Sequence, residues 1–376
     1  MAKLGDIATY INGYAFKPQD WSDEGIPIIR IQDLTGNSYQ ANRYNGEYAS
    51  KYEVNDGDVL ISWSASLGVY IWHGEKAVLN QHIFKVVFDK ERISKDFFVH
   101  QVGLILENAA SDAHGATMKH LTKPVFDALP FYLPPYEKQC EIAEVLDKVT
   151  SLISLRKQQL AKLDELVKAR FVEMFGDAKL NPNNLPCCSL SECIVFLTSG
   201  SRGWSQYFTD SGEYFITIKN VKNCKITLQD VQCVTPPDNA EAKRTRVQEN
   251  DLLISITADL GRTGIVTKEI AEHGAYINQH LTCIRLKQDK LNPLYVAYYM
   301  ESDAGKEQFI AKNQSAVKAG LNFNAINSLK LMVPPLALQN QFAAFVERVD
   351  QQKQTVQQSL EKLELMKKAL MQEYFG

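Results

Sequence analysis

The segment LPPYEKQCEIAEVLDKV at residues 133–149 returns in altered form as VPPLALQNQFAAFVERV at residues 333–349. The two segments lie 200 residues apart without a gap, and the same shift places KARFVEMFG at 168–176 on KALMQEYFG at 368–376. A match that keeps one offset over this distance indicates an internal repeat. The chain is therefore predicted to consist of two copies of one unit, each ending in the same kind of tail.

Both tails carry apolar residues at alternating steps of four and three, which places those residues on one stripe of a helix. A stripe kept over more than four heptads predicts a coiled coil, and a surface helix packed on its own domain is the alternative. Arg156, Arg170, Lys353 and Lys367 also fall on the stripe, where their stems can cover apolar surface or their charges can face another protein. The predicted coiled-coil seam residues are Ile142, Leu146, Val149, Ile153, Leu160, Leu163 and Val167 in the first tail, and Phe342, Val346, Val349, Val356, Leu360, Leu363 and Leu370 in the second.

Proline pairs precede both tails, and Gly176 and Gly376 close them. Each predicted helix is therefore about 40 residues and ~60 Å long. Connectivity favours an antiparallel pair, because the second globular part then bridges the end of the first helix and the start of the second. We expect the two globular parts at opposite ends of a rod, related by a pseudo-twofold axis.

Shorter matches extend the repeat upstream of the tails. GDVLIS at 57–62 matches NDLLIS at 250–255, and LNQHIFKV at 79–86 matches INQHLTCI at 277–284. Residues 177–189 carry Pro and Asn without periodicity and read as a linker. The predicted domains are a first globular domain at 1–136, a first helix at 137–176, the linker at 177–189, a second globular domain at 190–336 and a second helix at 337–376.

Short strands are expected in the globular domains, because several segments are rich in Ile, Val and aromatic residues and are bounded by turn residues. In the first copy these segments are residues 26–34, 58–63, 69–72 and 82–88. Residues 94–111 and 292–311 predict helices. The expected fold class is α+β, with a small curved β-sheet and helices in each of two tandem domains.

The composition limits the class of protein. Apolar residues make up 45% of the chain and charged residues 23%, which argues against a disordered protein. No apolar run approaches the ~20 residues that cross a bilayer, and the N-terminus lacks the pattern of a secretory signal, so we expect a cytoplasmic location. The seven cysteines contain no CxxC pair, which favours free thiols over a disulfide framework or a zinc site.

Catalytic motifs are missing from the sequence. An amino-methyltransferase needs a polar residue before its Pro-Pro-aromatic motif, and here Leu133 and Val333 precede the proline pairs. Neither a GxGxxG motif after a strand nor a Walker A motif occurs. Asp238, Glu241 and Lys243 imitate a nuclease metal site, but they stand too close in the chain for the hairpin that presents such residues. We therefore expect a non-catalytic chain with no metal site.

Polar loops recur at matching places in both copies, and they mix hydrogen-bond donors, acceptors and rings as readers of DNA base edges do. Asn-Gln-His triplets at 80–82 and 278–280 accompany them, either as a hydrogen-bond network at a strand start or as ligand contacts. The loops are residues 14–17, 63–68 and 115–120 in the first copy, and 201–204, 257–262 and 315–322 in the second.

This layout resembles the specificity subunit of a type I DNA restriction–modification enzyme over essentially the whole chain. The shared marks are the duplication, Leu4-Gly5-Asp6-Ile7, the strand at 57–62, the loop from Gly115 to Leu121 and, most specifically, the two tails from Pro-Pro to Phe-Gly. The resemblance implies two target-recognition domains, each reading one half of a split DNA sequence, held apart by the helices. It implies double-stranded DNA, two methyltransferase subunits and helicase-nuclease restriction subunits as partners. S-adenosylmethionine, ATP and Mg are then expected in those subunits, with no cofactor bound by this chain.

A non-catalytic coiled-coil scaffold without sequence-specific DNA reading is the alternative function. The net charge of −3 argues against a protein that grips DNA alone, because phosphate neutralisation supplies much of the affinity of DNA binding. Residues 1–136 carry 12 basic and 16 acidic side chains, and residues 177–336 carry 17 and 16. The candidate DNA-binding residues are Tyr14, Lys17, Arg30, Ser64, Ser66, His82, Thr117, Lys119 and His120 in the first copy, and Arg202, Lys219, Arg262, His280, Lys318 and Asn322 in the second.

Overall fold

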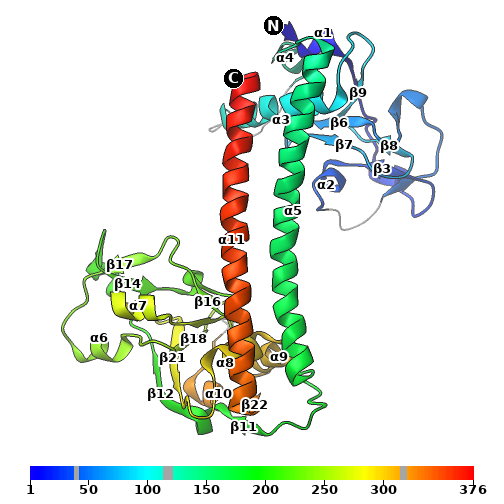
Figure 1. The fold of residues 1–376 in the computed structure, drawn as a ribbon. Helices are drawn as coiled ribbons and strands as arrows, with labels where there is room; N and C mark the ends of the chain where they lie inside the picture. Colours follow the sequence, from blue (N-terminus) through cyan, green and yellow to red (C-terminus); the bar gives the residue numbers. More distant parts are fainter. Residues whose placement is uncertain (38–41, 113–121, 314–319) are drawn as a thin grey trace. The chain divides into compact units, whose positions relative to one another are not determined.

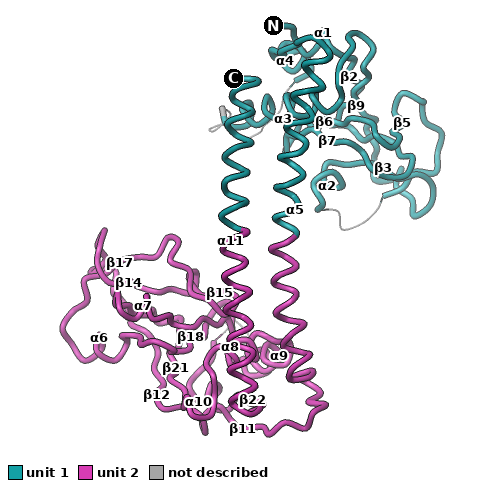
Figure 2. Tube along the Cα trace, viewed as in Figure 1, with its two compact units in different colours: residues 1–158, 357–376 teal, residues 159–356 magenta. Residues whose placement is uncertain are grey.

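The computed structural model describes residues 1–37, 42–112, 122–313 and 320–376. The chain forms two compact units, of which unit 1 contains residues 1–158 and 357–376 and unit 2 contains residues 159–356 (Figure 2). Two helices of 40 residues each, α5 (Tyr136–Phe175) and α11 (Leu336–Phe375), run from one unit into the other (Figure 1). Each unit therefore contains a globular part together with one half of each long helix.

Unit 1 contains two four-stranded sheets and one two-stranded pair. The first sheet is antiparallel with the order β2-β9-β6-β7, and the second has the order β4-β3-β8-β5 with a parallel β3–β8 pair. Strands β1 and β10 pair with each other. The strands are β1 (Ala2–Lys3), β2 (Thr9–Asn12), β3 (Ile26–Ile29), β4 (Arg43–Tyr44), β5 (Glu53–Val54), β6 (Val59–Ser62), β7 (Gly68–Ile71), β8 (Ala77–Leu79), β9 (Ile83–Val87) and β10 (Pro130–Phe131). The helices are α1 (Leu4–Ile7), α2 (Ile31–Leu34), α3 (Lys95–Asp112) and α4 (Lys123–Asp127).

Unit 2 repeats this plan. Its first sheet is antiparallel with the order β12-β21-β18-β19, and its second has the order β13-β17-β14-β20 with a parallel β14–β20 pair. The strands are β11 (Cys187–Ser189), β12 (Ile194–Ser199), β13 (Phe208–Thr209), β14 (Glu213–Ile216), β15 (Val221–Lys222), β16 (Lys225–Ile226), β17 (Gln232–Val234), β18 (Leu252–Ser255), β19 (Thr263–Ile265), β20 (Ala275–Ile277), β21 (Leu281–Leu286) and β22 (Lys330–Met332). The helices are α6 (Ala240–Thr245), α7 (Lys268–His273), α8 (Pro293–Glu301), α9 (Asp303–Ala311) and α10 (Phe323–Asn327).

The register of the strands matches the repeat in the sequence. Leu60 of β6 pairs with Lys85, and Leu253 of β18 pairs with Cys283, which are the positions that the aligned segments 57–62 and 250–255 place together. The internal repeat predicted from the sequence is therefore confirmed, and the structure adds that the strands of each unit divide between two larger sheets.

The central strands β6 and β18 are buried on both faces. Alternate side chains of a strand point to opposite faces, so Val59 and Ile61 enter one cluster of buried residues while Leu60 enters another. In unit 2, Leu252 and Leu253 divide between two clusters in the same way. This burial explains why the sequence reads Val-Leu-Ile and Leu-Leu-Ile here instead of alternating with polar residues.

The long helices pack against each other in antiparallel fashion within each unit. In unit 1, Leu146 near the start of α5 lies in the same cluster as Leu370 near the end of α11, and Lys157 pairs with Glu364 at 2.9 Å. In unit 2, the rings of Phe171 and Phe342 lie 5.5 Å apart, edge to face. The predicted antiparallel coiled coil is thus present, and its predicted seam residues are all buried or half-buried.

A buried glutamine joins each long helix to the globular part of its unit. Gln139 donates its amide to the carbonyl oxygen of Pro134 (2.8 Å) and accepts from the backbone N–H of Ser94, just before α3 (2.9 Å). Gln339 donates to the carbonyl oxygen of Pro334 (2.7 Å) and accepts from the N–H of Asn292, just before α8 (2.8 Å). The two copies therefore also share a buried glutamine that lies a few residues after each proline pair and makes the same contacts in each.

Two predictions of secondary structure were wrong. Residues 292–311 form the two helices α8 and α9, because the Ser302 side chain accepts from the N–H of Gly305 and caps a new helix. Residues 26–34 form strand β3 and then helix α2, because Asp33 accepts from the N–H of Arg30 at 2.8 Å. Both errors occurred where a local side-chain cap ended an apolar segment. Among the described residues, no helix is long and apolar enough to span a membrane.

Candidate nucleic-acid interface

In unit 1, the segment that follows β2 crosses the start of β9 and is held there by backbone hydrogen bonds. Gly13 and Tyr14 donate their N–H groups to the carbonyl oxygens of Ile83 (3.1 Å) and Leu79 (2.8 Å). Gln81 donates its N–H back to the carbonyl oxygen of Tyr14 (2.8 Å). The Asn-Gln-His triplet is thereby fastened to the segment that contains Tyr14.

Unit 2 makes the same three bonds. Gly200 and Ser201 donate to the carbonyl oxygens of Leu281 (3.1 Å) and Ile277 (2.8 Å), and Gln279 donates to that of Ser201 (2.9 Å). In both units the triplet also bonds to the loop that follows the central strand, since Trp63 N–H donates to His82 and Ile256 N–H donates to His280. We call this crossing of loops the loop junction, which comprises residues 12–14, 62–68 and 80–82 in unit 1 and residues 199–202, 255–262 and 278–280 in unit 2.

The crossing requires glycine in each unit. A Cβ atom on Gly13 would lie 2.0 Å from the carbonyl oxygen of Asn80, and one on Gly200 would lie 2.1 Å from that of Asn278. Neither glycine can carry a side chain unless the backbone of the triplet moves. The presence of glycine at this place in both copies therefore has a steric cause.

The loop after each central strand is closed by a buried serine. The Ser62 hydroxyl donates to the carbonyl oxygen of Ser66, and the Ser255 hydroxyl donates to that of Asp259. Inside each closed loop an alanine has a φ of +59° (Ala65 and Ala258), which an L-residue adopts only at a cost of about 1–3 kcal/mol. A strained conformation kept at the same place in both copies is typical of a loop that presents its residues for contact.

Aromatic side chains dominate the loop junction of unit 1. The Trp63 ring lies 4.9 Å from the His82 ring and is stacked on the Phe84 ring at 5.6 Å. Its indole N–H donates to the Asn12 side chain at 3.2 Å. Tyr14 is 45% exposed and offers a ring and a hydroxyl at the edge of the junction.

Polar and basic side chains dominate the loop junction of unit 2. His280 Nδ1 lies 2.7 Å from the Thr257 hydroxyl, and Arg202 Nε donates to Gln279 Oε1. Arg244 of α6 donates to the carbonyl oxygen of Ser199 at 2.8 Å and so brings a second guanidinium to the same segment. The two junctions therefore share a backbone frame and differ in the chemistry of the groups on it.

Seven of the residues predicted to contact DNA lie in the loop junctions. They are Tyr14, Ser64, Ser66 and His82 in unit 1, and Arg202, Arg262 and His280 in unit 2. Ser64 is buried and Ser66 is exposed, so the backbone frame presents them differently. Arg262 forms an ion pair with Asp259 inside its own loop, which offsets its charge.

The remaining predicted residues lie elsewhere in the structure or outside its described part. Arg30 directly follows Ile29, whose carbonyl oxygen accepts from the triplet, and its guanidinium lies 5.4 Å from the Trp21 ring. Lys17 is exposed just before the 3-10 turn Pro18–Asp20, and Lys219 is exposed inside the 3-10 turn Ile218–Asn220. The Asn322 side chain caps α10 by accepting from the N–H of Ala325 at 2.9 Å. The residues that lie outside the described ranges are Thr117, Lys119, His120 and Lys318.

Sequence reasoning missed Arg244 and the partnership between Arg202 and Gln279. Arg244 lies on a short helix of unit 2, and nothing in the aligned segments of the first copy points to it. Its neighbours Glu241 and Lys243 imitate a nuclease site in the sequence together with Asp238; Glu241 bonds outside this set and Lys243 pairs within it. Glu241 accepts from the indole N–H of Trp204 at 3.1 Å, and Lys243 pairs with Asp238 at 3.0 Å.

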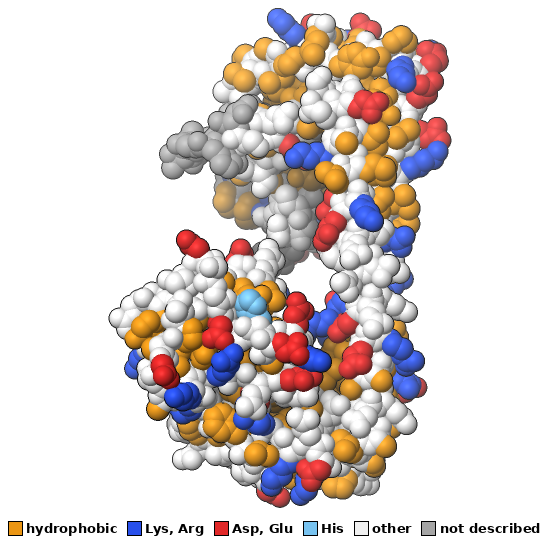
Figure 3. All heavy atoms as spheres, turned by 60° about the vertical axis from the view of Figure 1, so that its left-hand side comes forward, with side chains coloured by type: hydrophobic (Ala, Val, Ile, Leu, Met, Phe, Trp, Pro, Cys, Tyr) orange, Lys and Arg blue, Asp and Glu red, His pale blue; other side chains and the backbone are white. Residues whose placement is uncertain are grey.

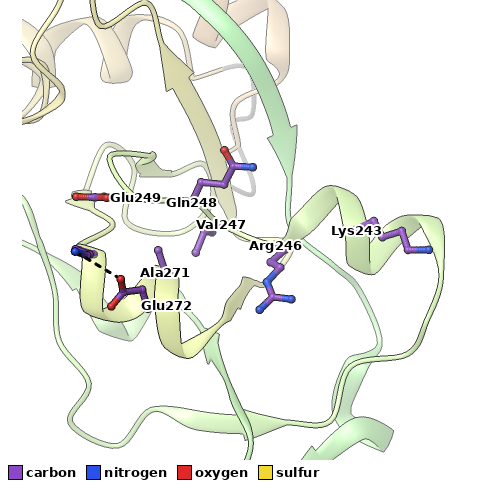
Figure 4. A pocket seen from close by; sticks show the side chains of 8 residues that line it. Lys243, Arg246, Val247, Gln248, Glu249, Ala271 and Glu272 are labelled. Carbon is purple, nitrogen blue, oxygen red and sulfur yellow. Dashed lines mark ion pairs between the residues drawn. The ribbon is translucent and has the colours of Figure 1, made fainter.

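The surface charges of unit 2 are mixed. In the face drawn in Figure 3, acidic and basic side chains are interspersed over the described part of this unit. A depression of about 360 Å³ lies beside α6 and α7 (Figure 4), where Arg246 pairs with Glu213 and Lys268 pairs with Glu272. Its lining residues are not part of the loop junction, and their cations already have carboxylate partners.

The carboxylate of Asp251 lies at the start of β18, at the end of this strand away from the loop junction, and its contacts show how the central strands are held together. Its hydrogen bond to Arg285 raises the pKa of that guanidinium, so the guanidinium stays charged. Burial, followed by the negative charge of Asp251, raises the pKa of the Cys283 thiol well above its usual value, so this thiol stays protonated and donates to the carboxylate at 3.2 Å. These contacts join the start of β18 to β21.

Comparisons with known proteins agree with the two-unit architecture. The chain matches the family described as "Type I restriction modification DNA specificity domain" over residues 1–165 and again over residues 205–365. It is 22% identical over 374 residues to the type I restriction enzyme EcoBI specificity subunit of Escherichia coli, covering 92% of this chain and 78% of that protein. It is 21% identical over 393 residues to the MjaVIII specificity subunit of Methanocaldococcus jannaschii, covering 99% and 90%.

Solved structures show a similar fold. The S subunit of a type I restriction–modification system from M. genitalium aligns over 100% of this chain and 95% of that chain, with a TM-score of 0.60 and 13% identity. A chain from a structure described as the basis of complex assembly and conformational transition of the type I R-M system aligns over 100% and 96%, with a TM-score of 0.58 and 16% identity. Since the family model matches both halves of the sequence, the chain belongs to the type I restriction modification DNA specificity domain family.

Proposed function

We propose that this chain is the DNA sequence-recognition subunit of a type I restriction–modification enzyme. Each globular part reads one half of a bipartite asymmetric target, and the paired helices fix the spacing between the halves and dock methyltransferase subunits. The observation that carries the proposal is the loop junction, which occurs once in each unit on the same backbone frame with different side chains.

A common frame with different side chains is what two readers of unlike sequences require. The frame sets the distance and angle at which side chains meet the DNA, while the identity of those side chains decides which base edges they accept. Both junctions carry an imidazole and hydroxyl groups, but unit 1 adds an indole and a phenol where unit 2 adds guanidinium groups. The two halves of the target should therefore differ in sequence.

The chemistry is assigned to partner subunits. We propose that this chain itself is non-catalytic and binds no cofactor, and that S-adenosylmethionine, ATP and Mg act in the methyltransferase and helicase-nuclease subunits. The proposal is supported by the Ser62, Ser255 and His280 side chains of the junctions, which are engaged in hydrogen bonds that hold loops in place. The assembled enzyme would act on double-stranded DNA in the cytoplasm.

Exchange of one globular domain tests the proposal. Residues 1–136 are replaced by the corresponding segment of a family member with a known target, and the methylated sequence is then determined in cells that carry the complete enzyme. A recognition subunit changes one half of the methylated sequence and keeps the other half. A coiled-coil scaffold without DNA reading would leave both halves unchanged, and that result would contradict the proposal.

A further inference from the structure

The loop junction of unit 2 holds one arginine in a position suited to base reading. Arg202 is exposed, whereas the residues on either side of it are anchored: Ser201 is 2% exposed and Trp204 is 3% exposed. The Ser201 hydroxyl lies 3.0 Å from that of Thr245, and Gly203 between Arg202 and Trp204 has a φ of +72°. The side chain of Arg202 thus projects from a backbone that is fixed on both sides.

The guanidinium of Arg202 is oriented by a neighbour from the Asn-Gln-His triplet. Its Nε donates to Gln279 Oε1, and the backbone N–H of Gln279 donates to Ser201 at 2.9 Å, so Gln279 is itself held against the arginine segment. Among the described residues, the two terminal nitrogens of Arg202 have no hydrogen bond. A guanidinium held through Nε presents these terminal groups as a planar fork.

The charge of Arg202 is also not offset. Four other arginines of unit 2 pair with carboxylates: Arg170 with Glu173, Arg246 with Glu213, Arg262 with Asp259 and Arg285 with Asp251. Within the described part of the chain no carboxylate forms an ion pair with Arg202. A cation that is exposed, unneutralised and fixed in direction is suited to contact an anionic or acceptor-rich ligand.

We propose that Arg202 reads a guanine in the major groove of the half-site bound by unit 2, and that Gln279 is its positioning residue. This inference rests on the proposed function. Guanine presents the N7 and O6 acceptors side by side in the major groove, and the planar fork of arginine matches them in a bidentate contact. No other base pair offers two adjacent acceptors there, so the contact selects guanine.

The corresponding place in unit 1 has different chemistry. The matching backbone positions carry Tyr14 and Ala15 where unit 2 has Ser201 and Arg202, although the triplet glutamine is kept as Gln81. The guanine contact is therefore a property of the second reader alone, and the first reader selects its bases by other groups.

The test uses the complete enzyme and the methylated sequence that it produces in cells. The half-site of unit 2 is the one that survives exchange of residues 1–136. Arg202→Ala and Arg202→Lys should each make one guanine position of that half-site unselective, because lysine keeps the charge and loses the fork. Gln279→Met should weaken selection at the same position, and Gln279→Glu, which keeps an acceptor for Nε, should restore it. Lys268→Ala removes the same charge outside the junction and should leave the sequence unchanged.

A duplex in which 7-deazaguanine replaces that guanine provides a readout on the unaltered protein. Loss of the N7 acceptor should weaken binding by the wild-type complex about tenfold and should have no effect on the Arg202→Ala complex. A half-site without guanine would overturn the inference. The inference would also be overturned if all Arg202 variants methylated the unchanged target sequence at a uniformly lower level, because that is the effect of losing a phosphate contact. In those cases the proposed function stands; it fails only if domain exchange changes neither half-site.

Discussion

The buried Asp251 carboxylate accepts two hydrogen bonds from the Arg285 guanidinium, each 2.8 Å long. In unit 1 the matching acid, Asp58, is 2.9 Å from the ammonium group of Lys85, which occupies the position of Cys283. Arg285 stands two residues beyond Cys283 on the same strand, and residues two apart on a strand point to the same face. The repeat therefore keeps an ion pair at the start of the central strand, and in unit 2 the cation lies one step further along that face.

Replacing Arg285 with methionine should destabilise unit 2 by about 3 kcal/mol, because it leaves a fully buried carboxylate without its cation. The matched change Lys85→Met should cost roughly 1 kcal/mol or less, since both members of that pair are partly exposed and Asp58 stays hydrated. Amide hydrogen exchange in β18 and β21 measures the stability of unit 2, and exchange in β6 and β9 measures that of unit 1. Equal losses of protection in the two units would contradict this account.

The crossing glycines should tolerate no side chain. Gly13→Ala and Gly200→Ala place a methyl group within 2.0–2.1 Å of a backbone carbonyl oxygen, and the strand start must move to relieve the clash. We expect a loss of at least ~2 kcal/mol and faster exchange of the triplet amides. Gly103→Ala is the control, because its new Cβ would meet only a Val69 methyl at 3.7 Å inside helix α3. That change should be neutral or stabilising; equal effects at all three glycines would refute the steric argument.

Truncating a side chain of the long helices to alanine should lower the free energy of unfolding more, the more deeply that side chain is buried. Leu146→Ala and Val346→Ala remove fully buried side chains from two different units, and each should cost about 2–4 kcal/mol. Leu155→Ala removes a side chain that is 58% exposed on the same helix as Leu146 and should stay within about 0.5 kcal/mol of wild type. Urea unfolding followed by helical circular dichroism gives the comparison. A cost at Leu155 as large as that at Leu146 would indicate a different packing face.

The paired helices could be predicted from the sequence because their signals are local and repeated. The step of four and three residues needs no knowledge of distant contacts, and Gln139 and Gln339 recur at the same offset from the proline pairs. The break at Ser302 was missed, since a serine cap competes with helix continuation by a hydrogen bond that only the folded backbone defines. Strand order was not recoverable either, because the parallel pairing of β3 with β8 joins segments separated by four intervening strands.

The site could be predicted only in part, for a related reason. Repetition pointed to the loops around Ser64 and Thr257 and to the Asn-Gln-His triplets, all of which lie in the loop junctions. Repetition cannot point to a residue that only one copy has, and Arg244 is such a residue. The orienting bond from Arg202 to Gln279 joins residues 77 positions apart, so it became visible only when the crossing at Gly200 was described.

Isolated chains should bind DNA weakly. The chain has a net charge of −3, and the first 136 residues are more acidic than basic, so few phosphates can be neutralised. We expect the purified chain to bind its target duplex with a Kd no tighter than about 10⁻⁶ M at physiological salt, which is the range of non-specific binding. Addition of the methyltransferase subunits should strengthen binding at least ~100-fold and make its salt dependence steeper. Tight sequence-specific binding by the chain alone would contradict this prediction.

Lengthening both helices should change the spacer of the DNA target and leave its half-sites intact. Three heptads inserted after Gln158 and three after Val356 keep the phase of the seam, because the seam repeats every seven residues. They lengthen each helix by about 31 Å, close to the ~34 Å of one DNA turn, so both readers can still meet the same face of the duplex. The methylated sequence should gain about 9–10 base pairs between unchanged half-sites.

A single heptad in each helix adds only ~10 Å, about a third of a DNA turn, and should lower methylation because one reader is rotated away from its groove. An unchanged spacer in the three-heptad enzyme would show that the helices do not set the spacing.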